Sequence, residues 1–216
     1  GLNWLKKSIP KIIEHNQFMS DIIIIDNQSN DESINYIRNN FSQIKTIINK
    51  KNYGFSKGYN KVLLKETKYE YFIILNNDVE VTENWIKPML EIIQNHSTGI
   101  VQPKIKSLEN DGFFEYAGGA GGYIDIFGIP FCRGRILHKM ELDQNQYNNI
   151  QRIFWASGCC FMIKKDLFQQ LKGFDEDLFM HQEEIDLCWR SQLTNYQVLF
   201  CPNSTVYHFG GGTLSY

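Results

Sequence analysis

The stretch that decides the fold is YFIILNNDVE, residues 71–80. Its apolar, strand-forming run ends abruptly in three polar side chains, Asn76, Asn77 and Asp78. This pattern predicts a buried strand that presents a carboxylate at its C-terminal end, which is the edge of an open α/β sheet where ligands collect. The same residues would also suit a plain strand end that caps the next helix. The flanking sequence distinguishes the two interpretations.

The composition excludes several classes of protein. The chain has 216 residues, of which 43% are hydrophobic, enough for one substantial core. Its formal net charge of -2 provides no field for binding nucleic acid. Apolar runs such as residues 22–25 are far shorter than the roughly 20 residues of a membrane span, and no signal peptide is recognisable. We therefore expect a cytoplasmic protein without a transmembrane segment or a nucleic-acid partner.

The five cysteines predict reduced, mostly buried thiols. Their number is odd, two of them are adjacent, and no C-x-x-C spacing occurs. Without such ligand spacing, a zinc site is not the expected interpretation.

Strands and helices alternate along the first half of the chain. Apolar runs predict strands at residues 21–26, 44–48, 71–75 and 100–102. Helical patterns follow the first three of them at residues 34–41, 59–63 and 85–93, and a helix interrupted at Pro10 precedes them at residues 1–15. This order predicts a Rossmann-like, mostly parallel central sheet with helices on both faces. The run at residues 21–26 is apolar enough for a strand that is covered on both faces.

Two further polar segments follow predicted strands. Asp26 ends its strand as Asp78 does, whereas Ser29 and Glu32 have the spacing of a capping box for the next helix. Residues 52–60 contain two glycines, a serine and Lys57 at the start of a helix, which fits an anion cradle of backbone N–H groups and an ammonium. An ordinary tight turn has a similar composition.

The periodicity stops between residues 107 and 151. A glycine-rich run at residues 117–122 predicts an irregular insertion in this segment. Its aromatic side chains suit stacking against sugar rings, and they would equally pin the insertion to the core. Regular elements return with a strand at residues 154–163, relieved by Gly158, a helix at residues 166–172 that ends at Gly173, and a last strand at residues 197–201.

Three acids crowd the first turn of another predicted helix: Glu183, Glu184 and Asp186. The helix dipole stabilises a negative charge there by about 0.3–1 kcal/mol. Carboxylates this close also raise one another's pKa, which is how a general base is prepared. His208 stands before a run of glycines and suits either a metal ligand or an ordinary loop histidine.

In this order, the segments resemble the family 2 glycosyltransferases, which are inverting enzymes of the GT-A fold, and most of all their rhamnosyltransferase-like branch in bacterial polysaccharide synthesis. The matching segments cover nearly the whole chain: Asp26-Asn27-x-Ser29-x-Asp31, Asn52-x-Gly54-Phe55-x-x-Gly58-x-Asn60, Leu75-Asn76-Asn77-Asp78, Gly173-Phe174-Asp175-Glu176 with Phe179, Glu183-Glu184-Ile185-Asp186-Leu187-x-Trp189-Arg190, and His208. The resemblance implies a single GT-A domain over residues 1–216. Its nucleotide-binding half would span residues 1–106 and its acceptor and catalytic half residues 107–216. It also implies a strand before residue 1 and helices after residue 216, so we expect a sequence that is truncated at both ends.

The resemblance assigns nucleotide-binding roles. It implies that Asp26 reads the base and that Asn52, Gly54 and Lys57 line the nucleotide and diphosphate region. Asn76 and Asn77 would belong to the same nucleotide site, with Asn77 near the ribose.

The resemblance also assigns the metal and the general base. Asp78 stands where the family has its D-x-D-like motif and would bind Mn²⁺ or Mg²⁺, while His208 would complete the metal site. Glu184 stands where the family has the Asp of its Glu-Asp pair, the general base, and Glu183 and Asp186 are the alternatives.

The implied reaction transfers a sugar from a nucleotide-diphosphate sugar, such as dTDP-rhamnose or a UDP-sugar. The acceptor would be a hydroxyl of a growing bacterial polysaccharide or lipid-linked glycan, with peripheral contact at the inner face of the cell membrane. A divalent metal would neutralise the leaving diphosphate, and a carboxylate would take the proton of the attacking hydroxyl. Two other functions stay open at this point. One is an inactive nucleotide- or sugar-binding module of the same fold, and the other is a nucleotidyltransferase, which would release pyrophosphate.

Overall fold

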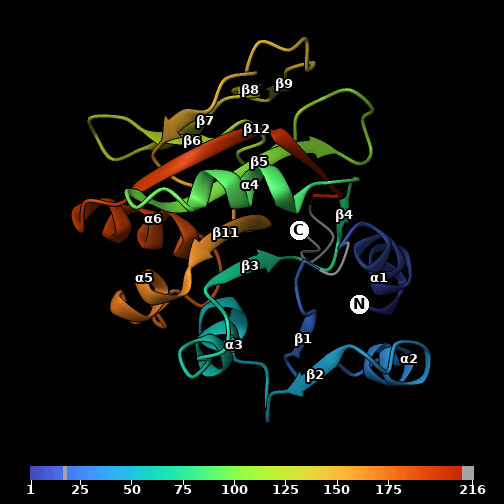
Figure 1. The fold of residues 1–216 in the computed structure, drawn as a ribbon. Coiled ribbons are helices and arrows are strands. Elements are labelled where there is room, and N and C mark those ends of the chain that lie inside the picture. The colour runs from blue at the N-terminus through green and yellow to red at the C-terminus, as the bar shows by residue number, and fades with distance from the viewer. Residues whose placement is uncertain (17–18, 211–216) are drawn as a thin grey trace.

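The structure is a computed structural model that describes residues 1–16 and 19–210. Helices and strands alternate in the first half of the chain (Figure 1). These elements are α1 (Leu2–Asn16), β1 (Ile23–Asp26), α2 (Ser33–Asn40), β2 (Lys45–Ile48), α3 (Gly54–Leu63), β3 (Tyr71–Leu75), β4 (Val79–Val81), α4 (Ile86–Ile93) and β5 (Thr98–Ser107). The second half comprises β6 (Gly122–Ile124), β7 (Pro130–Cys132), β8 (Arg135–Ile136), β9 (Lys139–Met140), β10 (Gln151–Ile153), β11 (Cys160–Lys164), α5 (Lys165–Gln170), α6 (Glu183–Leu193) and β12 (Gln197–His208).

The central sheet mixes strand directions. Its order is β10-β12-β5-β11-β3, and β4 pairs with the C-terminal part of β12. Only the β12/β5 pair is parallel; the pairs of β11 with β5 and β3, of β10 with β12 and of β4 with β12 are antiparallel. The prediction of a mostly parallel sheet is therefore wrong. Strand–helix alternation extends only to β5, and β11, which follows the insertion, then inserts antiparallel between β5 and β3.

Helices cover both faces of this sheet, as predicted (Figure 1). Successive side chains of a strand point to opposite faces, and in β3 Phe72 and Ile74 enter one core cluster while Ile73 packs against the other. The first cluster includes residues of α3, α5 and α6, and the second includes residues of α1 and α4. Because both faces of β3 are packed, its C-terminal end is held firmly in place.

β1 and β2 form a separate parallel pair. In the part of the chain that the structure describes, neither strand pairs with the central sheet. The side chains of residues 22–25 are half-buried and line a cleft, so the prediction that this strand is covered on both faces is wrong. The strand expected before residue 1 stays a prediction.

Two other elements differ from their predictions. α1 continues through Pro10 without interruption, because Pro10 lies on the exposed face, where water can satisfy the carbonyl it leaves unpaired. Of the strand predicted at residues 154–163, only residues 160–163 form a strand, as part of β11; residues 154–159 are irregular, and β10 precedes them. Trp155 instead pairs with Gly122 in an isolated bridge, and its indole ring packs on that glycine, where an added Cβ would lie 1.9 Å from the ring.

The insertion contains two short hairpins, β6–β7 and β8–β9. It is fixed to β5 by Lys104, whose ammonium contacts Asp143 Oδ2 at 3.0 Å and Asn148 Oδ1 at 3.2 Å. Of its aromatic side chains, Phe114 is fully buried in the core whereas Tyr116 is 55% exposed. Phe114 therefore pins the insertion to the core, whereas stacking of an exposed aromatic such as Tyr116 against a sugar ring stays a prediction. Among the described residues, no helix is long and apolar enough to cross a bilayer.

Candidate active site

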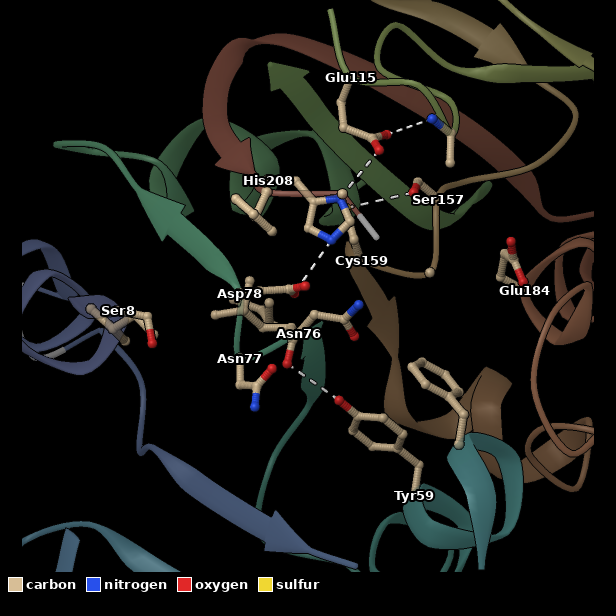
Figure 2. Close-up of a pocket in the computed structure, with 18 of the residues that line it drawn as sticks. Ser8, Tyr59, Asn76, Asn77, Asp78, Glu115, Ser157, Cys159, Glu184 and His208 are labelled. Atoms are coloured by element: carbon tan, nitrogen blue, oxygen red, sulfur yellow. Dashed lines mark hydrogen bonds and ion pairs between the residues drawn. The ribbon is translucent and has the colours of Figure 1, made fainter. Parts of the chain in front are cut away.

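A cleft of about 1110 Å³ opens at the C-terminal end of β3. It lies between α1 and β1 on one side and the insertion and the start of α6 on the other, and Figure 2 shows residues that line it. The cleft brings together most of the predicted site: Asn52, Gly54, Asn76, Asn77, Asp78, Glu183, Glu184 and His208. Asp26, Lys57 and Asp186 do not line it.

Asp78 is placed by the turn between β3 and β4. Asn76 N–H donates to the carbonyl of Cys159 at 2.9 Å, and the Asp78 carbonyl accepts from Phe209 N–H at 3.2 Å. These bonds tie the turn to the neighbouring chain segments. Asp78 is 3% exposed, and its Oδ1 is buried without a hydrogen-bond partner in the described residues.

His208 lies between two carboxylates (Figure 2). Its Nε2 is 3.3 Å from Asp78 Oδ1 and its Nδ1 is 3.3 Å from Glu115 Oε1. Neither contact has the angles of a hydrogen bond, so we describe both as ion pairs. Burial alone would lower the pKa of His208, but the two carboxylates outweigh it and raise the pKa to about 9. The ion pair with His208 in turn outweighs burial at Asp78 and lowers the pKa of that carboxyl.

The pair Asp78 and His208 fits a divalent cation. A carboxylate and an imidazole are ligands that Mn²⁺ accepts, and Asp78 Oδ1 is a buried oxygen that lacks a hydrogen-bond donor. Within the described residues, no group of three or more His, Cys, Asp or Glu side chains is arranged to hold a metal by itself. The remaining ligands would have to be water or phosphate oxygens, as is usual where a metal is bound together with a phosphorylated substrate.

The charges around the cleft support the same conclusion. Six carboxylates line it: Asp21, Asp78, Glu109, Glu115, Glu183 and Glu184. Its lining, in the part of the chain that the structure describes, includes no Lys or Arg. An anionic ligand here would therefore need a cation to offset the repulsion of these acids.

Glu183 and Glu184 begin α6, as predicted, and each has a buried Oε2 without a hydrogen-bond partner among the described residues. Burial, followed by the charge of Glu183, raises the pKa of Glu184 from 4.5 to about 7. Burial also raises the pKa of Glu183. Figure 2 shows Glu184 on the side of the cleft opposite Ser8 of α1.

Asp186 is differently placed. Its Oδ2 accepts hydrogen bonds from Arg190 at 2.8 Å (Nε) and 2.5 Å (Nη2), one helical turn away. Arg190 also donates to the carbonyls of Leu171 and Gly173, so Asp186 serves to anchor this segment.

Asn27, which neighbours Asp26, occupies the cleft. The Asp26 carboxylate accepts from Ser29 N–H at 3.2 Å, which fixes the turn after β1. The expected capping box is absent here, because α2 begins later and Glu32 is its N-cap residue. Asn27 instead lines the cleft and donates to the carbonyl of Gly54 at 2.7 Å.

The start of α3 does not form the predicted anion cradle with Lys57. The Lys57 ammonium pairs with Glu176 Oε2 at 2.7 Å, outside the cleft. Asn52 does line the cleft, and its Oδ1 accepts from Gly54 N–H at 2.9 Å. Gly54 has φ +73°, and an added Cβ would lie 2.5 Å from the carbonyl oxygen of Phe179, so glycine is required there.

Sequence reasoning missed several residues of the cleft, above all Glu115, Asn27 and Tyr59. Glu115 lies in a segment without periodicity, and nothing in the sequence indicates that it contacts His208, 93 positions later. Tyr59 was predicted as a helix residue only, but its hydroxyl donates to the Leu75 carbonyl at 3.3 Å, directly before Asn76.

Comparison with known proteins identifies the family. The sequence model of "Glycosyl transferase family 2" matches residues 2–172. The chain belongs to this family. The match covers β3, its Asn76-Asn77-Asp78 turn and the insertion, and it confirms the resemblance found in the sequence.

Individual relatives agree with this assignment. The chain is 26% identical over 196 residues to the low-salt glycan biosynthesis hexosyltransferase Agl10 of Haloferax volcanii, covering 88% of this chain and 59% of the relative. It is 21% identical over 163 residues to the rhamnosyltransferase WbbL of Escherichia coli, covering 73% of this chain and 61% of that protein. The chain thus spans about three fifths of the length of these two relatives.

A solved structure confirms the fold. The crystal structure of GalNAc-T7 with UDP, GalNAc and Mn²⁺ matches with a TM-score of 0.75 and 21% identity, over 96% of this chain and 41% of the other. This chain therefore has the GT-A fold that the sequence predicted, with a central sheet of mixed strand directions.

Proposed function

We propose that the protein is a metal-dependent inverting glycosyltransferase. It moves a sugar from a nucleoside-diphosphate sugar, with dTDP-rhamnose and UDP-sugars as the candidate donors, to a hydroxyl of a growing bacterial polysaccharide or lipid-linked glycan. The observation that carries this proposal is the acid-lined cleft with Asp78 and His208 at its floor and without Lys or Arg among its described lining residues. A nucleoside diphosphate is stable in such a cleft only together with a cation.

Asp78 and His208 hold Mn²⁺ or Mg²⁺ in this proposal. When bound, the ion supplies neutralisation of the charge that develops on the leaving diphosphate. For His208 to serve as a ligand it must lose a proton, because both ring nitrogens carry one in the ion-paired form with the raised pKa. Asp78 is ready to bind, since its Oδ1 is buried and has no hydrogen-bond donor in the described structure.

The nucleotide lies along the end of β1 and the start of α3. Asn27, Asn52, Asn76 and Asn77 line this part of the cleft and supply amide donors and acceptors for a base and a ribose. Asp26 and Lys57, which the sequence indicated for this role, are replaced in the proposal by Asn27 and by the metal. Asp26 fixes the turn that carries Asn27, and Lys57 pairs with Glu176.

Glu184 is the general base. It takes the proton of the acceptor hydroxyl as that oxygen attacks the anomeric carbon from the face opposite the diphosphate, so the configuration inverts. Its pKa of about 7 suits this step, because a base works best when its pKa is near the working pH. Glu183 raises that pKa and is a supporting residue in this proposal, and the pairing of Asp186 with Arg190 speaks for Glu184 rather than Asp186 as the base.

The site of action in this proposal is the inner face of the cell membrane, where a lipid-linked acceptor would lie. The side chains that support membrane contact belong to the hairpins of the insertion, where Ile126 and Phe127 are 92% and 82% exposed. Exposed apolar side chains of this size suit peripheral insertion among lipid headgroups.

Calorimetric titration tests the donor site. UDP, dTDP and GDP are each titrated into the wild-type protein and into Asp78→Asn, with and without Mn²⁺. We expect one nucleotide to bind tightly with Mn²⁺ only, and Asp78→Asn to lose that binding. Asp166→Asn is the control, because it removes a carboxylate that pairs with Lys165 on α5, outside the cleft.

A product assay then tests the reaction. A glycosyltransferase releases the nucleoside diphosphate when donor and acceptor are both present. Release of pyrophosphate, or metal-dependent nucleotide binding without any turnover of its sugar derivative, would contradict the proposed function.

A further inference from the structure

We propose that Glu115 is a positioning residue that orients His208 for metal binding. It holds the imidazole with Nδ1 toward the insertion and Nε2 toward Asp78. The inference rests on the proposed metal-dependent function and assigns a role in it to the insertion, which otherwise provides only walls of the cleft.

Glu115 is rigidly placed. Its side chain is 5% exposed, and its Oε2 accepts from Ala117 N–H at 2.6 Å, which leaves Oε1 to face His208 Nδ1 at 3.3 Å (Figure 2). The backbone beside it is tied to β5 by the bond from Glu115 N–H to the Ile105 carbonyl, at 3.1 Å. A carboxylate with one oxygen fixed by its own loop has little freedom to turn away from the imidazole.

The two contacts of His208 lie on opposite edges of its ring. Nε2 faces Asp78 on the cleft side and Nδ1 faces Glu115. A cation shared by Nε2 and Asp78 therefore cannot also reach the Glu115 oxygen that contacts Nδ1. This geometry separates a ligand role for Asp78 from an orienting role for Glu115.

Such an orienting contact has a chemical purpose. A neutral imidazole carries one proton, and only the nitrogen without it can bind a metal. A carboxylate that faces Nδ1 favours the tautomer with the proton on that nitrogen, which leaves a free electron pair on Nε2 and restrains the plane of the ring. Loss of such a partner typically weakens metal binding by roughly 10- to 100-fold.

The chain that follows His208 also passes close to Glu115. Gly210 has φ +68°, and an added Cβ there would lie 3.3 Å from Glu115 Oε1. The carboxylate is thus enclosed by the end of β12 as well as by its own loop, which leaves one favourable position for it.

The test measures Mn²⁺ affinity by electron paramagnetic resonance, in the presence of UDP, for wild type, Glu115→Ala and Glu115→Gln. Glu141→Ala is the matched control. Its carboxylate also lies in the insertion, where it accepts from Gly134 N–H and from the Tyr147 hydroxyl, but it does not contact His208. We expect Glu115→Ala to weaken Mn²⁺ binding by roughly 10- to 100-fold. Glu115→Gln keeps one acceptor oxygen for the two N–H donors that face the carboxylate, those of Ala117 and of His208 Nδ1, so it should lose less than Glu115→Ala, and Glu141→Ala should match wild type.

A second readout reports the orientation directly. In the Mg²⁺–UDP complex, ¹⁵N resonances of labelled histidine distinguish a protonated Nδ1 from a protonated Nε2. Wild type and Glu115→Gln should show His208 with the proton on Nδ1, and Glu115→Ala should show a mixture. Because Glu115→Gln is isosteric, it keeps the test valid if Glu115→Ala does not fold.

The outcomes separate the two proposals. If wild type binds no Mn²⁺ with any of UDP, dTDP or GDP, the proposed metal-dependent function fails. If wild type binds Mn²⁺ and Glu115→Ala binds it equally well with an unchanged tautomer, the role of Glu115 is overturned and the function stands. The role of Glu115 would also be overturned if both variants lost the same Mn²⁺ affinity and kept the His208 tautomer unchanged. The negative charge of Glu115, and not its orientation of the imidazole, would then determine Mn²⁺ affinity.

Discussion

At the scale of single residues, the pKa values of two acids of the cleft shift in opposite directions. Asp78 is buried beside a cationic imidazole, so its pKa falls and it stays ionised, as a metal ligand must. Glu184 is half-buried, with its Oε2 fully covered, and lies beside another acid, so its pKa rises to about 7. The sign of the neighbouring charge determines the direction of each pKa shift. The lowered pKa of Asp78 suits its proposed role as a metal ligand, and the raised pKa of Glu184 suits its proposed role as the general base.

The first prediction concerns the pH dependence of catalysis. Glu184 must be ionised to accept a proton, so the rate should rise with pH through about 7 and level off above it. Glu184→Gln should lower kcat by roughly 10²- to 10⁴-fold with little change in donor KM, because the base acts only during the reaction. Glu183→Gln should move the rising limb to lower pH, since it removes a charge that raises the pKa of Glu184. pH–rate profiles of the three proteins measure this.

Asp186→Asn provides the comparison for this prediction. Asp186 pairs with Arg190 outside the cleft, so its loss should leave the position of the rising limb unchanged. A rising limb that persists in Glu184→Gln and disappears in Asp186→Asn would contradict the assignment of the base.

The second prediction concerns stability. The pKa of Glu184 is higher in the folded protein than its ordinary value of 4.5, so folding favours its protonated form. This contribution is fully present below pH 4.5 and is lost as the pH rises through about 7. Glu184→Gln, which is always neutral, should therefore raise the free energy of unfolding at pH 8 by up to about 3 kcal/mol relative to its effect at pH 4.5. Urea unfolding at the two pH values measures the difference, and an equal effect at both would contradict it.

The sequence predicts many of the residues that line the cleft, but it does not predict the direction in which each side chain points. Asp78 and Glu184 occupy the ends of elements whose period is clear, and the structure places both in the cleft. Lys57 and Asp186 belong to the same motifs, yet each turns to an ion-pair partner, Glu176 or Arg190, that only the folded chain reveals.

At the scale of elements, α3 depends on its contact with the segment before α6. Phe55 N–H donates to the Phe179 carbonyl at 2.9 Å, and the Ser56 hydroxyl donates to the Leu178 carbonyl at 2.5 Å. This contact joins the proposed nucleotide region to the helix that carries Glu184. Gly54 makes it feasible, because its backbone is left-handed and leaves no room for a side chain against Phe179.

The third prediction uses a matched pair of glycine substitutions. Gly54 and Gly128 have similar left-handed backbones, φ +73° and φ +82°, but an added Cβ meets Phe179 at the first and nothing within 4 Å at the second. Gly128→Ala should cost about 1 kcal/mol of unfolding free energy from backbone strain alone. Gly54→Ala should cost roughly 1–3 kcal/mol more, because the Phe179 segment must move. Urea titrations compare them, and equal losses would show that this contact does not stabilise the fold.

The elements themselves were largely predictable, whereas their directions were not. The continuous apolar run of β3 predicts a buried strand, and the structure confirms it, because both faces of β3 are packed. An apolar strand is equally suited to a parallel or an antiparallel neighbour, so the pattern of β11 could not indicate that it runs antiparallel to both β3 and β5. In the irregular segment between β10 and β11, Trp155 packs on Gly122, a contact between residues far apart in sequence.

At the scale of the whole molecule, the cleft collects groups from distant parts of the chain. Asp78 follows β3, Glu115 lies in the insertion, Glu184 begins α6 and His208 ends β12. The central sheet supports this arrangement because β12 spans it, pairing with β5 along its length and with β4 beside Asp78. The site is therefore sensitive to how the insertion is seated on the sheet.

The insertion also determines which surface the molecule presents outside the cleft. Its hairpins carry the three most exposed large apolar side chains of the described residues, Ile126, Phe127 and Leu137, at 92%, 82% and 83%. Residues 126–140 include two arginines and one lysine and no Asp or Glu, although the whole chain has a net charge of -2. The cations belong to the β8–β9 hairpin, where Arg135 and Lys139 flank Leu137, whereas Ile126 and Phe127 lie at the tip of the β6–β7 hairpin beside Asp125. Together the two hairpins present exposed apolar side chains next to basic ones, which suits contact with an anionic lipid surface, where the proposed lipid-linked acceptor would lie.

The fourth prediction follows from that surface. The double variant Ile126→Asp/Phe127→Asp should sediment with vesicles that contain anionic phosphatidylglycerol at least about tenfold less than wild type, because burying one such side chain contributes about 1.5–3 kcal/mol. Leu193→Asp is the control, since Leu193 is 74% exposed but lies at the end of α6 and outside the insertion. It should bind the vesicles as wild type does. Equal binding of all three proteins, or concentration-dependent dimerisation through the hairpin with no vesicle binding, would contradict membrane contact at this surface.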